Sequence, residues 1–490
     1  MGRLTVKLRR KLLFVLLLML VLVALPFLRP GTMRPVNRPI ARYRDPGQHQ
    51  FERLELLRGK HEDLVVLAFS GGGTRAAAFS YGVLETLRRI KVRQGGVSLR
   101  LLDEVDVVFG ISGGSFTALA YGLYGERLFS EYERRFLKRN VQRDLTLRVL
   151  NPLNWRALVS SGWGRSELAA DFYDEILFHG ATFADLERAG GPAIAVGATD
   201  LGTGARVVFV PQNFDIMCAD LSGFRIARAA AASSAVPVVL SPLTIDNYGG
   251  SCGYREPEWL RPFIEATSPP RPAGRVLKRL QELRAIDEAG RDRYLHLVDG
   301  AVADNLGLRG VLDYLEAFEA LRSSGFPTPL DHVRRIIIFV VNSVSTPSFD
   351  WNESENPPPT LSILTKTAGV PVDRYANESV ELLKDIDARW SMLREMRDSF
   401  ARSRDKNTLP AYVQNAPDAD IYPIEVSFQA LKDETERERL NQLPTSFHLP
   451  DEAVDRLRSA AAKILLGSTE LRRALAEEWV GVDEIGPPSQ

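Results

Sequence analysis

A serine flanked by glycines, Ser112, is the residue in this 490-residue chain whose surroundings most strongly suggest chemistry. It lies in the turn Gly110–Gly114, between the apolar run 105–109 and the helix-compatible stretch 116–120. A strand that turns sharply into a helix through glycines exposes a serine hydroxyl at the helix N-terminus, which is how a nucleophile is presented. Because glycine–serine turns are common in loops, this pattern needs support from the rest of the chain.

A glycine-rich segment upstream is suited to binding a negative charge. Residues 64–69 read as a buried strand and residues 76–90 as a helix, and a tight turn joins them. The turn contains Gly71, Gly72, Gly73 and Arg75. Backbone N–H groups of consecutive glycines are uncovered by side chains and can converge on a developing oxyanion. A dinucleotide-binding loop is the alternative, and it is disfavoured because Ala76 stands where that fingerprint has its third glycine.

The proton acceptor for such a serine is not an obvious histidine. Only His296 of the six histidines lies near another candidate, Asp299, and strand alternation places these two side chains on opposite faces. Asp299 ends an expected strand and is followed by Gly300 and Ala301, at the edge where open α/β sheets bind ligands. If burial raises its pKa, this carboxylate can accept the Ser112 proton directly. The sequence therefore allows a Ser–Asp dyad without histidine.

These features resemble one family, the patatin-like phospholipases, and in particular bacterial members with an N-terminal membrane anchor. That family combines an oxyanion loop G-G-G-x-R, a nucleophile turn G-x-S-x-G and an aspartate motif D-G-G or D-G-A. The corresponding residues here, in the family's order, are Gly71, Gly72, Gly73 and Arg75; Gly110, Ser112, Gly113 and Gly114; and Asp299, Gly300 and Ala301. Two further blocks, 198–204 and 229–237, are similar to family blocks, and the resemblance runs from about Leu64 to about Ser343.

The resemblance implies a three-layer α/β fold with a mostly parallel central sheet flanked by helices, and hydrolysis of lipid esters. Asp299 would take the proton from Ser112, which attacks the ester carbonyl, while the Gly72 and Gly73 amides hold the oxyanion and Arg75 orients the loop. Water would then release the fatty acid from the acyl-enzyme. No metal and no cofactor are implied. Ala76 and Ala301 replace glycines that are frequent in the family, and neither change removes a reacting group.

Other functions with the same residues stay open. An acyltransferase or thioesterase would differ only in whether another acceptor, rather than water, takes the acyl group. A catalytically silent lipid-binding scaffold and a nucleotide-binding protein are further alternatives. The intact Ser112 and Asp299 argue against the first of these, and the missing third glycine argues against the second. The lipid headgroup, the acyl position and the oligomeric state are not determined by the sequence.

An uncharged apolar run near the N-terminus, Leu12–Leu28, predicts an uncleaved membrane anchor. Four basic residues, Lys7, Arg9, Arg10 and Lys11, precede it. At about 1.5 Å per residue the run covers most of a hydrocarbon core of about 30 Å. The alternatives are a cleaved signal peptide, for which no small-x-small site follows Ala24, and a lipoprotein, for which no cysteine lies nearby. The charges on the two sides nearly balance, and we favour a body outside the cytoplasm.

The distribution of charge divides the chain into a basic tether and an acidic body. The chain contains 62 basic and 62 acidic residues, but residues 1–44 contain ten basic and no acidic ones, so the remainder has a net charge of −10. The tether is therefore expected to contact anionic lipid headgroups, while the body does not bind them through its net charge. A nucleic-acid partner is disfavoured for the same reason. The alternative is that the arginines belong to a solvated linker.

The oxidation state of the two cysteines, Cys218 and Cys252, depends on the compartment in which the body lies. Outside the cytoplasm they could form one disulfide, and inside it they would be reduced. Both possibilities stay open at this point.

We expect four parts along the chain: an anchor at 1–30, an Arg/Pro linker at 31–60, a catalytic domain at 61–345, and a C-terminal helical region with one strand at 346–490 that packs on the catalytic domain. Two insertions, at about 127–190 and 249–292, are candidate lids or acyl-chain walls. The alternative is ordinary packing, which we favour for the tryptophans of the first insertion, Trp155 and Trp163. Later strands are expected at Ala193–Thr199, Val207–Val210, Tyr294–Val298 and Arg335–Val341. Further along, helices are expected at Glu378–Arg402, Pro450–Leu466 and Thr469–Trp479, and a strand that completes the main sheet at Ile421–Phe428.

Overall fold

The computed structural model describes most of the chain after residue 61. It covers residues 35–43 and 62–483, together with residues 11, 14–15 and 17–19, apart from gaps at 95, 159, 161, 238, 257–259, 261–262, 264–273, 288–292, 347–349, 354, 403–408 and 477.

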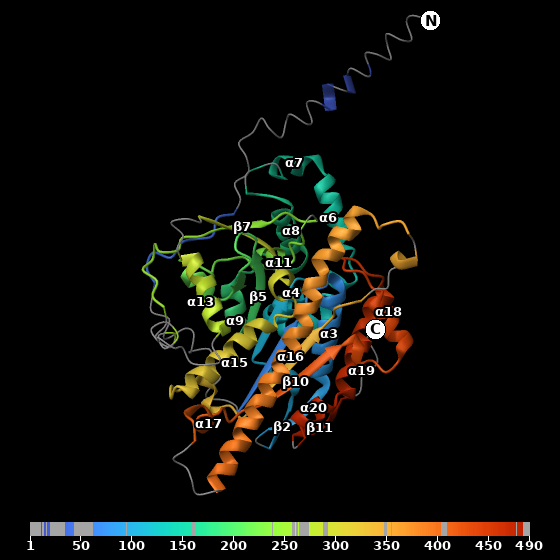
Figure 1. Ribbon diagram of the computed structural model, residues 1–490. Coiled ribbons are helices and arrows are strands. Elements are labelled where there is room, and N and C mark those ends of the chain that lie inside the picture. Colours follow the sequence, from blue (N-terminus) through green and yellow to red (C-terminus); the bar gives the residue numbers. More distant parts are fainter. Residues whose placement is uncertain are drawn as a thin grey trace, which may run out of the picture.

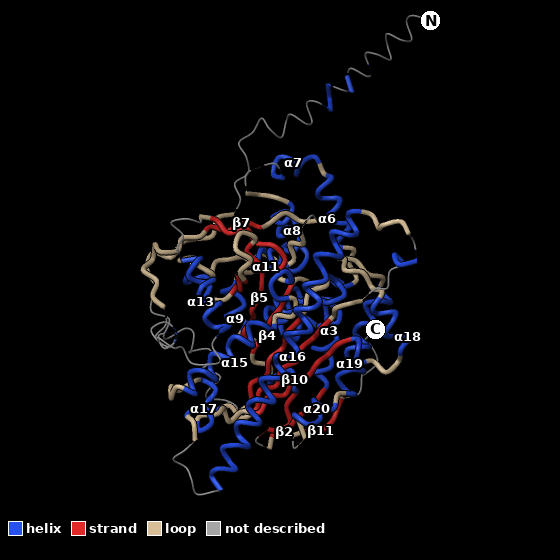
Figure 2. The backbone as a smooth tube through the Cα atoms, in the orientation of Figure 1, coloured by secondary structure: helices blue, strands red, loops and turns tan. Residues whose placement is uncertain are grey.

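An eight-stranded sheet forms the centre of the described structure (Figures 1 and 2). Its order is β10-β9-β1-β4-β5-β8-β7, and β6 pairs with β5 beside this path. The five strands from β10 to β5 are parallel, whereas β6 and β8 run antiparallel to β5. The bounds are β1 Asp63–Phe69, β4 Val107–Ile111, β5 Ala193–Asp200, β6 Arg206–Phe209, β7 Leu243–Asp246, β8 Tyr294–Asp299, β9 Arg335–Asn342 and β10 Asp420–Ser427.

Helices cover both faces of this sheet. The helices are α3 Gly73–Arg89, α4 Gly113–Tyr124, α5 Leu128–Tyr132, α6 Val141–Leu150, α7 Pro152–Leu158, α8 Arg165–Tyr173, α9 Phe183–Ala189, α10 Pro211–Ile216, α11 Ile226–Ser233, α13 Gly274–Asp287, α14 Ala301–Asp304, α15 Leu308–Ser323, α16 Thr360–Arg402, α17 Ala411–Gln414, α18 Glu434–Asn441, α19 Asp451–Gly467 and α20 Thr469–Ala474.

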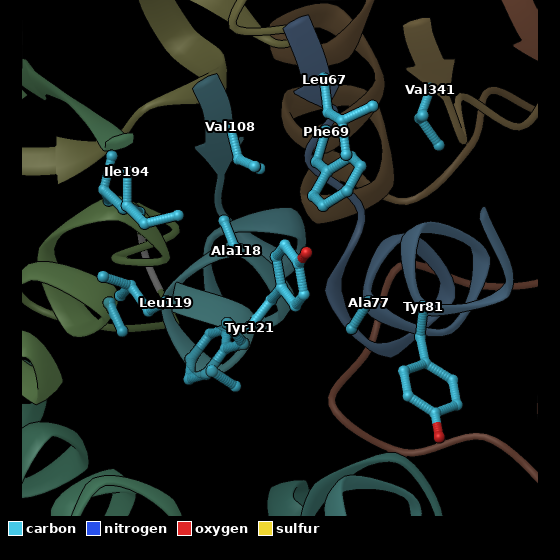
Figure 3. Packing of buried hydrophobic residues seen from close by; sticks show 14 of the residues in the cluster. Leu67, Phe69, Ala77, Tyr81, Val108, Ala118, Leu119, Tyr121, Ile194 and Val341 are labelled. Carbon is cyan, nitrogen blue, oxygen red and sulfur yellow. The ribbon is translucent and has the colours of Figure 1, made fainter. Parts of the chain in front are cut away.

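The central strands are nearly continuous apolar runs because both of their faces are buried. On one face Leu67 and Phe69 belong to a large core shared with α3, α4, α11 and α19, part of which Figure 3 shows. On the other face Val66 packs in a second core with residues of α15 and α16. The predicted α/β fold with a mostly parallel sheet between helices is thereby confirmed.

The C-terminal region is joined to the main sheet through β10, which pairs in parallel with β9 as expected. Two predictions about this region were wrong. Its helix α16 begins at Thr360 and continues through Pro371, whereas the sequence placed the start at Glu378. Trp479 does not end a helix but begins the strand β11 Trp479–Val482, so the region has two strands.

A small second sheet, with the order β11-β2-β3, explains that second error. Its other strands are β2 Ile90–Gln94 and β3 Val97–Arg100. The pairing partner of β11 is the strand β2, nearly 400 residues earlier, so local periodicity alone could not reveal it.

The run Leu12–Leu28, predicted to be a membrane anchor, lies largely outside the described residues. Its described residues include Phe14, Val15 and Met19, which are helical and largely exposed. Within the described part of the chain, no helix combines the length and the apolar character needed to cross a bilayer.

A short part of the linker, residues 35–43, is attached to the body rather than solvated along its whole length. Asn37 exchanges two hydrogen bonds with the backbone of Asp246 in β7. The backbone N–H of Ile40 donates to the Cys218 carbonyl, and that of Tyr43 donates to the Cys252 carbonyl. These two cysteines form a disulfide. Residues 37–43 are therefore held against the body by these contacts.

The two candidate lids differ in structure. The segment 127–190 is helical as expected, from α5 to α9. Of its tryptophans, Trp163 is buried, in agreement with ordinary packing, whereas Trp155 is exposed. The segment 249–292 is described only in part, and its helix α13 packs against α15.

Candidate active site

Ser112 and Asp299, 187 residues apart in the sequence, are joined by a hydrogen bond. The Ser112 hydroxyl donates to Asp299 Oδ2 at 2.8 Å, and each residue is only 4% exposed. Ser112 lies between β4 and α4 with a positive φ of 48°, a backbone conformation that non-glycine residues rarely adopt. This strained turn holds the hydroxyl at the start of α4, as the glycine–serine pattern predicts.

The register of the sheet explains how Asp299 reaches this position. Strand β4 ends at Ile111, which is paired with Gly197 of β5. On the other side of β5, Asp299 is paired with Ala198, the next residue. Ser112 and Asp299 therefore flank β5 at nearly the same level.

The sequence argument placed Asp299 at the C-terminal end of its strand, at the edge where open α/β sheets bind ligands, without considering the direction of that strand. Strand β8 is antiparallel to β5 and pairs only with its last residues, down to Ala198. Because β8 enters from beyond the carboxyl edge, its own end lies at that edge.

The Asp299 carboxylate is held by two hydrogen bonds in an environment without solvent. Oδ1 accepts the backbone N–H of Ala301 at 2.9 Å, and Oδ2 accepts the Ser112 hydroxyl. Burial raises the pKa of Asp299 to about 6, and these two hydrogen bonds oppose the rise. Asp299 is therefore ionised at neutral pH, and its pKa is close enough to pH 7 for the carboxylate to accept a proton.

The glycine loop lies directly against the nucleophile turn. A Cβ at Gly113 would be only 2.0 Å from the Gly73 carbonyl oxygen, and one at Gly114 would be 2.7 Å from the Phe69 and Ser70 carbonyl oxygens. Gly110 is equally enclosed, because a Cβ there would be 2.7 Å from the Ser115 α-carbon. The two turns can approach this closely only because these positions have no side chains.

The three loop glycines differ in what their amides contact. The N–H of Gly71 donates to the Asn305 carbonyl at 2.9 Å and is therefore occupied. Gly72 and Gly73 have positive φ angles, and within the described residues their N–H groups have no protein partner. Gly72 and Gly73 thus stay the candidates for an oxyanion hole, next to the start of α3.

The hydrogen bonds of Arg75 go to residues other than Ser112 and Asp299. Its guanidinium donates to the Ser343 carbonyl, the Leu443 carbonyl and the Thr445 hydroxyl. Burial lowers the pKa of Arg75 to about 10. These contacts tie the glycine loop to the end of β9 and to the C-terminal region, which fits the orienting role rather than direct contact with an oxyanion.

The block 229–237 contacts both Ser112 and Asp299. The sequence argument did not assign these contacts. Ser233 Oγ accepts the backbone N–H of Ser112 at 2.8 Å. The Ser233 carbonyl accepts the Gly300 N–H, and the Ala235 carbonyl accepts the Asp299 N–H. The signal in the sequence was the resemblance of this block to the family, which marked the segment without giving its function.

Asn305 is a second residue that the sequence argument missed. A Cβ at Gly71 would lie 2.7 Å from Asn305 Oδ1 and 3.3 Å from Ser112 Cβ, so the amide side chain borders the space beside the nucleophile. Only its position six residues after Asp299, in the same turn region, hinted at this.

His296 does not take part in this arrangement. It is exposed on β8, and its Nδ1 lies 3.1 Å from the Thr244 hydroxyl. The predicted separation of His296 from Asp299 agrees with this position. The Ser112 hydroxyl donates its hydrogen bond to the Asp299 carboxylate instead.

Comparison with models of protein families identifies the family to which the chain belongs. Residues 67–312, half of the chain, match the family described as patatin-like phospholipase. The chain belongs to this family. The match includes the glycine loop, Ser112 and Asp299, and it supports the expected classification as a lipid acyl hydrolase. No match was found among curated protein sequences.

Alignments with two solved structures cover most of this patatin-like chain, at low sequence identity and low TM-score. Human GIVD cytosolic phospholipase A2 has 15% identity and a TM-score of 0.38, with 87% of this chain and 65% of that chain covered. The type III effector protein ExoU has 16% identity and a TM-score of 0.21, with 85% and 93% covered. The chain thus spans about two thirds of the length of the human enzyme.

Proposed function

We propose that this chain is a membrane-anchored serine acyl hydrolase that releases fatty acids from phospholipids, lysophospholipids or related lipid esters. The observation that carries the proposal is the 2.8 Å hydrogen bond from the Ser112 hydroxyl to the buried Asp299 carboxylate. Family membership supports the lipid ester as substrate.

The first half of the proposed reaction forms an acyl-enzyme. Asp299 Oδ2 takes the hydroxyl proton while Ser112 Oγ forms a bond to the ester carbonyl carbon. The Gly72 and Gly73 amides stabilise the resulting oxyanion, and loss of one such donor typically lowers the rate about 100-fold or more. As the intermediate collapses, the C–O bond to the alcohol breaks, and protonated Asp299 returns the proton to the leaving alkoxide.

The second half regenerates the enzyme with the same groups. Water attacks the acyl carbonyl and Asp299 accepts its proton. The bond from the acyl carbon to Ser112 Oγ then breaks, protonated Asp299 returns the proton to Oγ, and the fatty acid is released. The raised pKa of Asp299, about 6, supports this double use, because the carboxylate is ionised at pH 7 yet basic enough to accept a proton.

The location of the enzyme is part of the proposal. The apolar run Leu12–Leu28 would anchor the chain, and the catalytic body would lie outside the cytoplasm. Two observations support this placement. The described residues Phe14, Val15 and Met19 are exposed helical apolar residues, which water does not favour. The Cys218–Cys252 disulfide is typical of proteins outside the cytoplasm.

Turnover of a lipid panel by the full-length chain in detergent micelles tests the proposal. The panel contains phospholipids, lysophospholipids and a short p-nitrophenyl ester, and wild type is compared with Ser112→Ala and Asp299→Asn. We expect fatty-acid release from wild type and a loss of about 1,000-fold or more in both variants, because each removes a reacting group.

Matched controls separate chemistry from folding. Ser80→Ala removes a buried hydroxyl that has no hydrogen-bond partner among the described residues. Asp106→Asn neutralises a carboxyl whose pKa burial raises to about 7, and which precedes the start of β4. Both controls should retain turnover. A folded wild type without turnover of lipid or short ester contradicts the hydrolase, and acyl transfer to added alcohol or thiol acceptors would then identify the alternative.

A further inference from the structure

One end of the molecule exposes a group of large apolar side chains from three separate segments. Helices α6 and α7 and strand β7 lie together at this end (Figures 1 and 2). We call it the α6–α7 face, and its exposed apolar residues are Val36, Leu147, Leu150, Leu153, Trp155 and Val239. Leu153 is 86% exposed, and apolar exposure of this kind in a group marks an interaction surface.

Contacts between the segments hold this face together. Helix α6 packs against α7 and α8. At the start of α8, the backbone N–H and the hydroxyl of Ser166 both bond to Ser241, which lies two residues after Val239 and two before β7. On β7, Asp246 exchanges hydrogen bonds with Asn37, the neighbour of Val36. These contacts link the three segments that carry the exposed apolar residues.

The segments of this face contain more basic than acidic residues, and one of the basic residues, Arg148, forms an ion pair with Glu175. Residues 141–165 contain four arginines and one aspartate, and residues 36–43 contain two arginines and no acidic residue. The body as a whole is acidic. A surface that combines leucines, a tryptophan and arginines matches the chemistry of an anionic bilayer interface, where apolar side chains enter the acyl boundary and basic ones contact the headgroups.

The described part of the linker begins at this same face, with Val36. Only seven residues lie between Leu28 and Val36, so even in a fully extended chain these two residues are at most about 29 Å apart. If Leu12–Leu28 enters a bilayer, the α6–α7 face is the part of the body held beside it.

The active site lies close to this face along the chain. Val239 is 67% exposed, and Ala235, whose carbonyl accepts the Asp299 N–H, is only four residues earlier. Four residues reach at most about 14 Å. A lipid surface on this face would therefore bring ester groups near the buried Ser112 and Asp299.

We propose that the α6–α7 face binds the surface of an anionic phospholipid bilayer and thereby presents lipid to the active site. This proposal rests on the proposed function, because it identifies the physical state in which the substrate is taken up. A protein partner on the same face is the alternative that the test excludes.

The proposal can be tested without catalysis by measuring how deeply single positions enter the bilayer. The full-length chain is reconstituted into vesicles of phosphatidylcholine and phosphatidylglycerol. An environment-sensitive dye is attached to Leu153→Cys in one sample and to Val97→Cys in another. Val97 is also exposed, but it lies in the small second sheet, whose strand β2 is at the other end of the molecule in Figure 1. We expect a blue shift and quenching by chain-labelled lipid only at position 153.

Activity supplies the second readout. The double variant Leu150→Glu/Leu153→Glu should lower turnover of vesicle phospholipid about tenfold or more, since burial of each leucine is lost and charges are added. Turnover of the short soluble ester should not change. Val97→Glu/Val480→Glu, which places the same charges on exposed residues of the second sheet, should leave both activities unchanged.

The outcomes separate this proposal from the proposed function. Water-exposed dye at both positions overturns membrane binding by this face, whether or not the enzyme hydrolyses lipid. Lipid quenching at position 153 in a chain that lacks all turnover supports the face and contradicts the hydrolase. Equal loss of vesicle turnover in both double variants also overturns the proposal, because the effect would then not depend on this face.

Discussion

At the scale of single residues, the Asp299 carboxylate is both a proposed base and a source of instability. It is 4% exposed, and its only hydrogen-bond donors among the described residues are the Ser112 hydroxyl and the Ala301 N–H. Burial raises its pKa to about 6, which means that the folded protein resists its ionisation. The property that suits it to accept a proton therefore lowers the stability of the fold at neutral pH.

Asp299→Asn should accordingly raise the free energy of unfolding at pH 8 while it abolishes turnover. In the unfolded chain the aspartate pKa is about 3.9. Between about pH 4 and pH 6 the folded state binds more protons than the unfolded state, so wild type loses stability as pH rises through this window. The gain at pH 8 should be about 1–3 kcal/mol, and near zero at pH 4. Urea unfolding at both pH values measures it.

Asp185→Asn gives a comparison with the opposite sign. This carboxylate accepts hydrogen bonds in the capping box of α9, which lower its pKa, so its loss should reduce stability at pH 8. If Asp299→Asn were also less stable than wild type at pH 8, the account of a desolvated carboxylate would be wrong.

At the scale of elements, the site depends on two turns in close contact and on the register of three strands. Strands β4, β5 and β8 set the level at which Ser112 and Asp299 meet. The turns that begin α3 and α4 touch where a Cβ at Gly113 would lie 2.0 Å from the Gly73 carbonyl oxygen. This contact would keep the candidate oxyanion amides beside the nucleophile.

Gly113→Ala should therefore impair catalysis through geometry, without changing a reacting group. The backbone at Gly73 or Gly113 would have to shift, and we expect turnover of the short ester to fall about 100-fold or more, comparable with loss of an oxyanion donor. Steady-state kinetics together with a thermal unfolding curve give the result.

The matched control is Gly467→Ala at the end of α19. No heavy atom lies within 4 Å of an added Cβ there, and its φ is not positive. It should keep full turnover and gain about 0.4–1 kcal/mol of stability. Wild-type turnover in Gly113→Ala would show that the contact between the two turns does not position the site.

At the scale of the whole molecule, the disulfide lies where the described part of the linker, residues 35–43, is attached to the body. Cys218 and Cys252 close a loop of 34 residues that includes α11 and β7. Their carbonyls accept hydrogen bonds from Ile40 and Tyr43, so the bridge also supports the segment 35–43. The attachment of residues 40–43 to the body therefore depends on this bridge.

Replacing both cysteines by serine should lower the free energy of unfolding by about 2–4 kcal/mol, because the unfolded chain gains freedom. The amides of Ile40 and Tyr43 should also exchange hydrogen faster. Urea unfolding and hydrogen exchange under non-reducing conditions measure these effects. Wild type denatured without reductant should show no free thiol, and detection of two would contradict the bridge.

Much of this protein could be predicted from its sequence because the information is local. Apolar runs and glycine turns predicted β1, β4, β5 and β9 and the turn at Ser112, and burial on both faces leaves a continuous apolar pattern in such strands. The likeness of three motifs to one family brought together Ser112, Asp299 and the glycine loop as candidates. Their catalytic roles remain predictions that the variants above test.

Tertiary structure decided what depends on partners far away in the chain. The antiparallel direction of β8, the pairing of β11 with β2, and the bond from Ser112 N–H to Ser233 all join distant residues. The same is true of the Gly71 amide, which the Asn305 carbonyl occupies, and of Arg75, which contacts residues 443–445. Periodicity and turn chemistry report a residue's own neighbourhood, whereas these features are set by which surfaces pack together once the core forms.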